Sequence, residues 1–215
     1  MSSTVYMNQA DLLAPPFARR IQMRSLLIGL AFAVLTIIGA LVTPHEQFWH
    51  AYLLGFMGWL GLSLGSMAFL MLWYLTGGRW GITARRIVEA AMRTLPLMAV
   101  LFIPLAVGAR WLYDWADPNK VAHSPDLQHA KLAYLNLTGY WFRGIIYFVI
   151  WLGFAYLLSK LSAEQDHPPV RDLSRRFSKL SAAGVILYAF TITFAAIDWV
   201  MSLDASWIST VYGLI

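Results

Sequence analysis

The carboxylate of Asp198 lies inside an otherwise apolar stretch of the sequence. A charged side chain in a lipid-spanning helix is costly, so it usually faces protein or water and marks a proton or ion pathway or a paired structural site. Steps of three and four residues place Asp198 on one helix face with small and hydroxylated residues. That face predicts either a hydrogen-bonded file that carries protons to Asp198 or an ordinary seam of helix packing, and the sequence leaves both open. Its other members are Ser181, Gly184, Tyr188, Thr191, Ala195 and Ser202.

Three other polar residues are expected at a depth similar to that of Asp198, towards the outer face of the membrane. His50 begins one apolar stretch, Arg143 lies one turn inside another, and Asp204 closely follows Asp198. Asp198 precedes Leu203, the end of its own stretch, by five residues, which corresponds to about 7–8 Å of helix. Because arginine presents parallel donors to a carboxylate, we expect an ion pair between Arg143 and Asp198.

A second polar group opens the apolar stretch near residue 87. Glu89 and Arg93 are four residues apart, so they share a helix face and can form a pair. Pro96 and Pro104 follow, and each leaves a carbonyl of the preceding turn free to accept a bond from a side chain or water. The group is typical of the inner mouth of a hydrated cavity, and also of an interfacial ion pair followed by two proline kinks.

Long apolar stretches must position these residues. Of the 215 residues, 59% are hydrophobic and 13% charged, and several stretches reach the roughly 20 residues that a membrane-crossing helix needs. Lipid admits only helices and closed barrels, and the alternating pattern of barrel strands is absent. The sequence therefore predicts an all-α fold, a polytopic transmembrane helix bundle over residues 25–215, preceded by a cytoplasmic segment, 1–24. Five complete spans are expected at 25–43, 50–75, 87–112, 139–159 and 180–203, and 207–215 is expected to be the start of a truncated sixth span.

Basic residues set the expected orientation, because short loops rich in Lys and Arg stay in the cytoplasm. Residues 43–49 carry no such cation, and residues 113–138 carry only Lys120 and Lys131. The N-terminus is therefore expected in the cytoplasm. Basic and aromatic residues do not interleave as they do on nucleic-acid-binding surfaces, so no nucleic-acid partner is expected. The cations expected on the cytoplasmic side are Arg19, Arg20, Arg24, Arg79, Arg85, Arg86, Lys160, Arg171, Arg175, Arg176 and Lys179.

Cysteine and histidine usage limits the metal chemistry of the chain. The sequence has no cysteine, which excludes disulfides and thiolate-bound iron–sulfur or zinc sites within it. The histidines fall in expected loops or at a helix end, so no two of them can clamp a haem inside the bundle. The sequence therefore predicts no thiolate site and no haem site in the bundle, and no residue is singled out as a metal ligand or as a catalytic residue. The histidines are His45, His50, His123, His129 and His167.

Four segments carry a resemblance to a known family. They are Leu-Thr-Gly-Gly-Arg-Trp-Gly at 75–81, Arg-Arg-Ile-Val-Glu at 85–89, Arg-Thr-Leu-Pro-Leu-Met at 93–98, and Asp-Trp-Val-Met-Ser-Leu-Asp at 198–204 with Trp207. As a set they resemble the NrfD-like, or polysulfide-reductase-like, membrane subunits, and within that family the N-terminal half of the F subunit of bacterial alternative complex III, a quinol:cytochrome c oxidoreductase.

The resemblance implies a membrane subunit of a respiratory quinol oxidoreductase in the bacterial inner membrane. Such a subunit is not catalytic by itself and binds no cofactor other than, as a possibility, quinol. Iron–sulfur clusters and c-type haems would belong to partner subunits, and a second NrfD-like subunit would lie beside this one. Two alternatives stay open: a purely structural membrane anchor for redox subunits, and half of a secondary transporter.

The resemblance also implies a proton path or a quinol-side scaffold. A proton relay needs a carboxylate whose proton affinity is set by burial and by a neighbouring cation, as Asp198 and Glu89 would provide. A quinone site would instead need a polar donor beside an aromatic slot; Tyr140, Arg143 and Tyr147 offer this as the weaker hypothesis. The proton-path candidates are Asp198, Arg143, Glu89, Arg93, Asp204, Tyr188, Thr191 and His50.

Overall fold

The computed structural model describes residues 16–77, 84–123, 134–166 and 173–204. Within those ranges the regular secondary structure is entirely helical, which confirms the predicted all-α fold. Five helical segments are long and apolar enough to cross a membrane, so the chain is a multi-pass membrane protein. The expected start of a sixth span, 207–215, lies outside the described residues. The five segments are Arg19–Val42, His45–Thr76, Arg85–Val107, Leu137–Gln165 and Ser174–Leu203.

The chain divides into two compact units, residues 1–48 and 49–215. The first unit contains α2 (Pro16–Val42) and the start of α3 (His45–Thr76). The α2 helix has 27 residues, more than the roughly 20 that cross a bilayer. The chain leaves α2 at Thr43 and Pro44, and the N–H of Phe48 already donates to the carbonyl of Pro44 at 3.0 Å. A second helix therefore starts almost at once.

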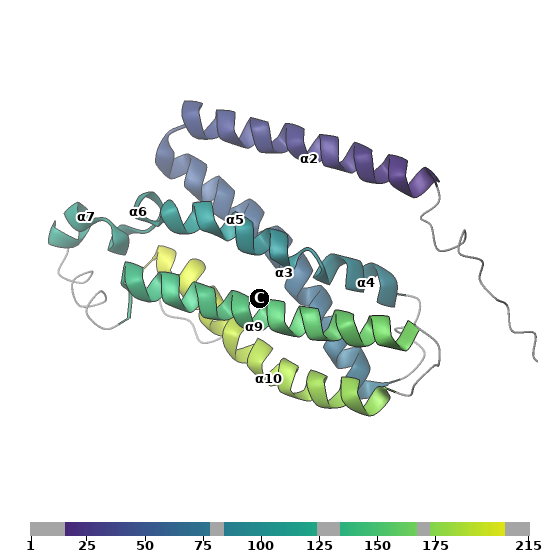
Figure 1. Ribbon diagram of the computed structural model, residues 1–215. Coiled ribbons are helices and arrows are strands. Elements are labelled where there is room, and N and C mark those ends of the chain that lie inside the picture. Colours follow the sequence, from purple (N-terminus) through teal and green to yellow (C-terminus); the bar gives the residue numbers. More distant parts are fainter. Residues whose placement is uncertain (1–15, 78–83, 124–133, 167–172, 205–215) are drawn as a thin grey trace, which may run out of the picture. The chain divides into compact units, whose positions relative to one another are not determined.

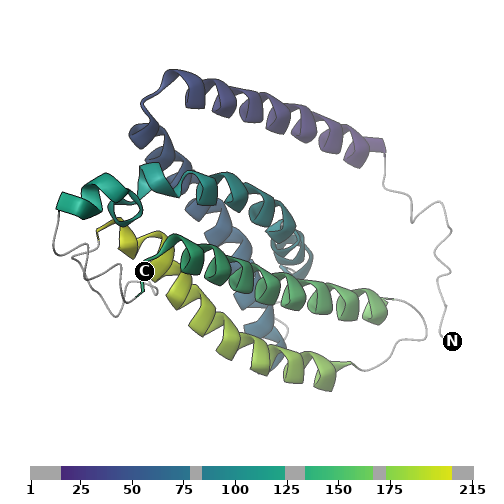
Figure 2. The ribbon, with the colours of Figure 1, turned by 60° about the vertical axis from the view of Figure 1, so that its left-hand side comes forward.

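The second unit carries the residues that the sequence singled out. Figure 1 shows its helices as one packed group, with α9 and α10 running side by side, and the turned view in Figure 2 agrees. Its described elements after α3 are α4 (Arg85–Met92), α5 (Leu95–Val107), α6 (Ala109–Leu112), η1 (Asp114–Ala116), α7 (Pro118–His123), α9 (Leu137–Asp166), α10 (Ser174–Trp199) and η2 (Met201–Leu203).

The third apolar segment is broken rather than continuous. The expected stretch 87–112 contains the end of α4, all of α5 and all of α6. Pro96 cannot donate a backbone hydrogen bond to the turn before it, so the helix is interrupted between Met92 and Leu95. At the break the hydroxyl of Thr94 donates to the carbonyl of Ala91 at 2.7 Å and lies 2.6 Å from the hydroxyl of Ser63 in α3. These contacts satisfy backbone and side-chain groups that lipid could not.

Aromatic side chains fill the space between α3, α5, α9 and α10. The indole of Trp199 is fully buried, with its ring centroid 4.9 Å from that of Phe102 and 6.0 Å from that of Trp151. Phe56 and Phe148 complete this cluster from α3 and α9. Such rings contribute large buried areas and favour offset or edge-to-face contacts. The core therefore holds the end of α10, and with it Asp198, in a fixed place.

The face of α10 that contains Asp198 is buried, as its pattern predicted. Ser181, Gly184, Thr191 and Ala195 lie on it and are all buried. The opposite face is exposed and apolar, with Ile186, Phe190 and Phe194, as expected of a helix side that meets lipid.

Candidate functional site

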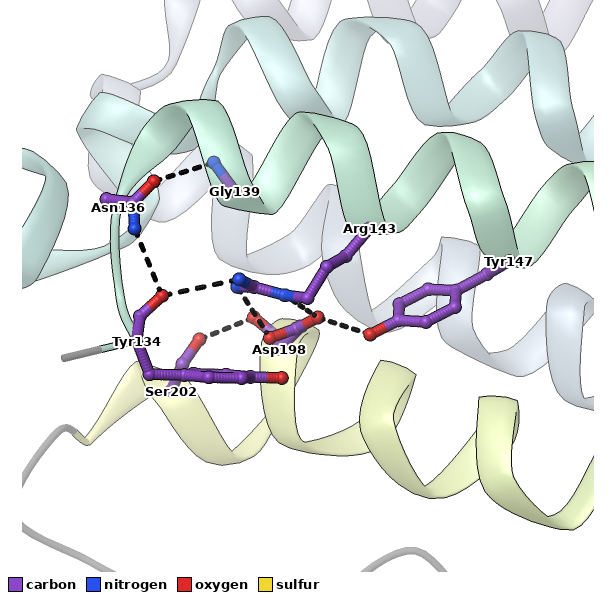
Figure 3. Close-up of polar contacts among 7 residues, drawn as sticks. All are labelled: Tyr134, Asn136, Gly139, Arg143, Tyr147, Asp198 and Ser202. Carbon is purple, nitrogen blue, oxygen red and sulfur yellow. Dashed lines mark hydrogen bonds and ion pairs between the residues drawn. The ribbon is translucent and has the colours of Figure 1, made fainter.

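Asp198 accepts three hydrogen bonds inside the bundle, and its side chain has no exposed surface. Arg143 donates from Nε to Oδ2 at 2.8 Å and from Nη2 to Oδ1 at 2.9 Å. Tyr147 donates its hydroxyl to Oδ2 at 2.7 Å. Figure 3 shows this arrangement between α9 and α10. The predicted ion pair between Arg143 and Asp198 is therefore present, in the two-pronged geometry that arginine favours.

The start of α9 brings Arg143 and Tyr147 to the same side. They are four residues apart, so both project from the helix face that packs against α10. Asn136 fixes where α9 begins, because its Oδ1 accepts the backbone N–H of Gly139 at 2.6 Å. This is the side-chain cap that helix N-termini favour. The hydroxyl of Tyr147, assigned to the weaker quinone hypothesis by sequence, is thus directed at Asp198.

Tyr134 completes the site, although no sequence pattern pointed to it. Its ring centroid lies 4.0 Å from Cζ of Arg143, a cation–π distance. Its carbonyl also accepts a bond from Nη1 of Arg143 at 3.3 Å. Burial, followed by the nearby negative charge of Asp198, raises the pKa of Tyr134 to about 12. The phenol therefore stays neutral at physiological pH.

Side chains from the segment after α6 and from η2 donate to carbonyls at the end of α10 and in η2. Helix C-termini leave carbonyl groups without partners in the helix. The hydroxyl of Tyr113 donates to the carbonyl of Trp199 at 2.8 Å, and Nε1 of Trp115 donates to the carbonyl of Ser202 at 3.1 Å. The hydroxyl of Ser202 donates to the carbonyl of Asp198. Burial raises the pKa of Tyr113 well above its usual value, so this phenol remains a donor.

The second polar group forms a cluster at the opposite end of α9. The side chain of Glu89 is buried, and its Oε1 accepts a bond from Nη2 of Arg93 at 2.6 Å. Its Oε2 accepts the hydroxyl of Ser162 at 3.0 Å. Ser162 in turn accepts a bond from Nη2 of Arg85 at 2.6 Å, and Arg86 approaches Glu89 to 3.8 Å. The predicted Glu89–Arg93 pair is present, but the sequence missed Ser162, since a serine near a helix end carries no distinguishing pattern.

Two predicted members of the Asp198 group lie outside its hydrogen bonds. His50 and Asp204 are exposed. Among the described residues, the carboxylate of Asp198 receives its hydrogen bonds from Arg143 and Tyr147 alone. His50 also lies inside α3 rather than at its start, because that helix begins at His45.

The middle of the α10 face is closely packed. Thr191 Oγ1 accepts the indole N–H of Trp151 at 2.9 Å and donates to the carbonyl of Leu187 at 2.7 Å. A Cβ added at Gly184 would lie 2.5 Å from the sulfur of Met71. Tyr188 is half-buried. At this depth the geometry favours the packing seam over a hydrated file.

Tyr140 lies beside the Asp198 site in an aromatic environment. It is fully buried, with its ring centroid 5.6 Å from that of Tyr113 and 6.0 Å from that of Phe102. Its hydroxyl has no hydrogen-bond partner within the described part of the chain. Of the three quinone candidates, Tyr140 is thus the one whose donor is not already used by Asp198.

The two polar clusters are far apart. Arg143 and Ser162 are separated by 19 residues of α9, or about 28 Å along a helix. Trp151 and the aromatic core lie between them along this helix. The described residues therefore hold two separate half-sites, one near each end of the bundle.

No group of three or more His, Asp or Glu side chains that could hold a metal ion occurs within residues 16–77, 84–123, 134–166 and 173–204. No protein-family model matches the chain, and no curated protein matches it.

Proposed function

We propose that this chain is an integral membrane subunit of a bacterial respiratory quinol oxidoreductase, in the inner membrane with its N-terminus in the cytoplasm. The five apolar helices support a membrane subunit. The segments that resemble NrfD-like subunits, above all residues 85–98 and 198–204, support the respiratory role. Iron–sulfur clusters and c-type haems belong to partner subunits, beside a second NrfD-like subunit. This chain contributes no catalytic residue.

The observation that carries the proposal is the buried carboxylate of Asp198 in its bond with Arg143. A charge at this depth is costly, and intramembrane carboxylates of this kind mark proton pathways. A proton that reaches Asp198 neutralises it and frees Arg143, and departure of the proton restores the pair. Tyr147 supplies a third hydrogen bond that holds the carboxylate in place. Asp198 is thus the proton site of the outer half-path.

Glu89 is the corresponding group of the cytoplasmic half-path. Arg93 and Ser162 hold its carboxylate, and the break between α4 and α5 follows within one turn. Broken helices in membrane proteins place backbone carbonyls where they line cavities. The middle of the α10 face is closely packed, so the two half-paths do not join along it.

Three alternatives are less well supported. For a quinone site, Arg143 and Tyr147 would first have to leave Asp198, because both already donate to it. For a purely structural anchor, the favourable observation is that Asp198 has hydrogen bonds at both oxygens. The third alternative is that the chain is half of a secondary transporter.

The substitution Asp198→Asn separates these functions. We expect the purified complex to assemble in normal amount but to lose about tenfold or more in quinol-dependent turnover and proton release, as for other proton-transfer groups. The matched control is Asp114→Asn, since Asp114 is exposed and pairs with Lys120 at 2.8 Å. Normal turnover per assembled complex, with less complex, would instead identify a structural anchor. Purification without redox subunits would support a transporter.

A further inference from the structure

Tyr134 is held at the site by contacts rather than by inclusion in a helix. It precedes α9, and its carbonyl accepts the N–H of Asn136 at 3.2 Å and Nη1 of Arg143 at 3.3 Å. Its ring stacks on the guanidinium of Arg143. The backbone at Tyr134 is therefore free of the helical hydrogen bonds that fix Arg143 and Tyr147 on α9.

The ring of Tyr134 covers the ion pair. Figure 3 shows the ring edge-on, alongside Arg143 and Asp198, with its hydroxyl at the end nearer Tyr147. Arg143 retains 20% of its side-chain exposure, whereas Asp198 has none. The ring therefore stacks on the partly exposed guanidinium, and the carboxylate beside it is fully buried.

Two opposing free-energy terms act on Tyr134 when its ring is stacked on Arg143. Stacking on a desolvated cation is favourable. The hydroxyl of Tyr134, however, is enclosed without a hydrogen-bond partner in the described structure, and an enclosed donor without a partner is unfavourable by a similar amount. Moving the ring away would hydrate that hydroxyl and lose the stacking contact. The stacking contact alone therefore does not fix the position of the ring, as a gate requires.

We infer that Tyr134 is an aromatic gate, which keeps water from the carboxylate of Asp198 when its ring is stacked on Arg143 and admits water when the ring moves aside. The inference rests on the proposed function for its purpose, because controlled access of water is what an outer proton site needs. When the gate is closed, the carboxylate of Asp198 is dry; when it is open, Asp198 can exchange a proton with water. The stacked position is the closed one.

A cysteine probe beside the pair tests the gate in the full chain in its membrane. The chain has no cysteine, so Ser202→Cys introduces a single thiol next to Asp198, at a position that is only 4% exposed. We expect slow reaction with a charged, water-soluble methanethiosulfonate. Tyr134→Ala should raise that rate by about tenfold or more, since reactivity follows the population of the open state. Tyr134→Phe keeps the ring and should react no faster than the parent.

Two controls make the outcome decisive. Tyr156→Ala removes an exposed tyrosine from α9 and should leave the rate unchanged. A thiol at Ser63, which is buried in α3, should stay unreactive in the Tyr134→Ala background. Equal rates in the parent and the Tyr134→Ala variant, an increase in Tyr134→Phe, or reaction at Ser63→Cys would each overturn the gate. The labelling experiment does not depend on turnover. The gate can therefore be disproved while Asp198→Asn still slows the complex, and the gate can be supported even if Asp198→Asn has no effect on turnover.

Discussion

The ion pair between Arg143 and Asp198 is strong because Arg143 donates to both oxygens of the carboxylate. Without Arg143 the carboxylate of Asp198 would be a fully buried charge without its cation, whereas the pair satisfies it. Arg143→Met should therefore destabilise the protein by about 3–5 kcal/mol, the usual cost of breaking a buried pair from one side. Replacing both residues, as Arg143→Met with Asp198→Leu, removes the stranded carboxylate and should restore most of that loss. Unfolding of the purified chain in detergent measures each variant.

The stability of the double variant decides whether the two residues act as a pair. If it is as unstable as the sum of the two single variants, the residues do not act as a pair. Arg110→Met is the control, because Arg110 is an exposed arginine and its substitution should change stability little.

Sequence alone could identify the pair but not its surroundings. An intramembrane carboxylate needs a cation, and Arg143 is the one placed at a suitable depth. Tyr134 and Ser162 need no particular partner, because tyrosines in loops and serines near helix ends are common. Their sequence positions therefore did not predict their contacts. Only the fold brings Tyr134 onto Arg143 and Ser162 onto Glu89.

At the scale of the helices, the class of structure was predictable because lipid admits so few alternatives. The helix ends were less so: α9 extends to Asp166, beyond the apolar stretch 139–159, because a helix can continue in polar sequence. The break before Leu95 follows from Pro96, but its stabilisation by Thr94 and Ser63 required two helices to meet.

Gly144 links the packing of α9 to the site. It follows Arg143 directly, and an added Cβ would lie 2.6 Å from Cζ of Phe102. Phe102 is held by Phe148 and Trp199, so it cannot move aside at low cost. Gly144→Ala should therefore destabilise the protein by about 1–3 kcal/mol, as overpacking does. Thermal unfolding of the purified chain measures the effect.

The matched control for that substitution lies on the same helix. A Cβ at Gly153 would meet nothing within 4 Å, so Gly153→Ala should leave stability unchanged or slightly higher. Equal destabilisation by both substitutions would show that α9 responds to lost flexibility rather than to contact with Phe102.

At the scale of the whole chain, the orientation in the membrane decides which half-site faces the cytoplasm and which faces outward. The described ends of the second unit differ in charge. Arg85, Arg86, Lys160 and Arg175 are on the side of Glu89, whereas residues 113–123 and 134–136, before α9, have Lys120 as their one Lys or Arg. Because cations are retained in the cytoplasm, the Glu89 end should face inward and the Asp198 end outward.

Single cysteines in this cysteine-free chain can test that direction. Asn119→Cys should react with a membrane-impermeant maleimide in intact spheroplasts, since Asn119 is exposed in α7, near the Asp198 end. Lys160→Cys and Arg20→Cys, also at exposed positions, should react only after the membrane is opened. The reverse pattern would place Asp198 on the cytoplasmic side and make it the proton site of the inner half-path. Reaction in intact spheroplasts at both Arg20→Cys and Asn119→Cys, but not at Lys160→Cys, would contradict the expected side of the N-terminus alone.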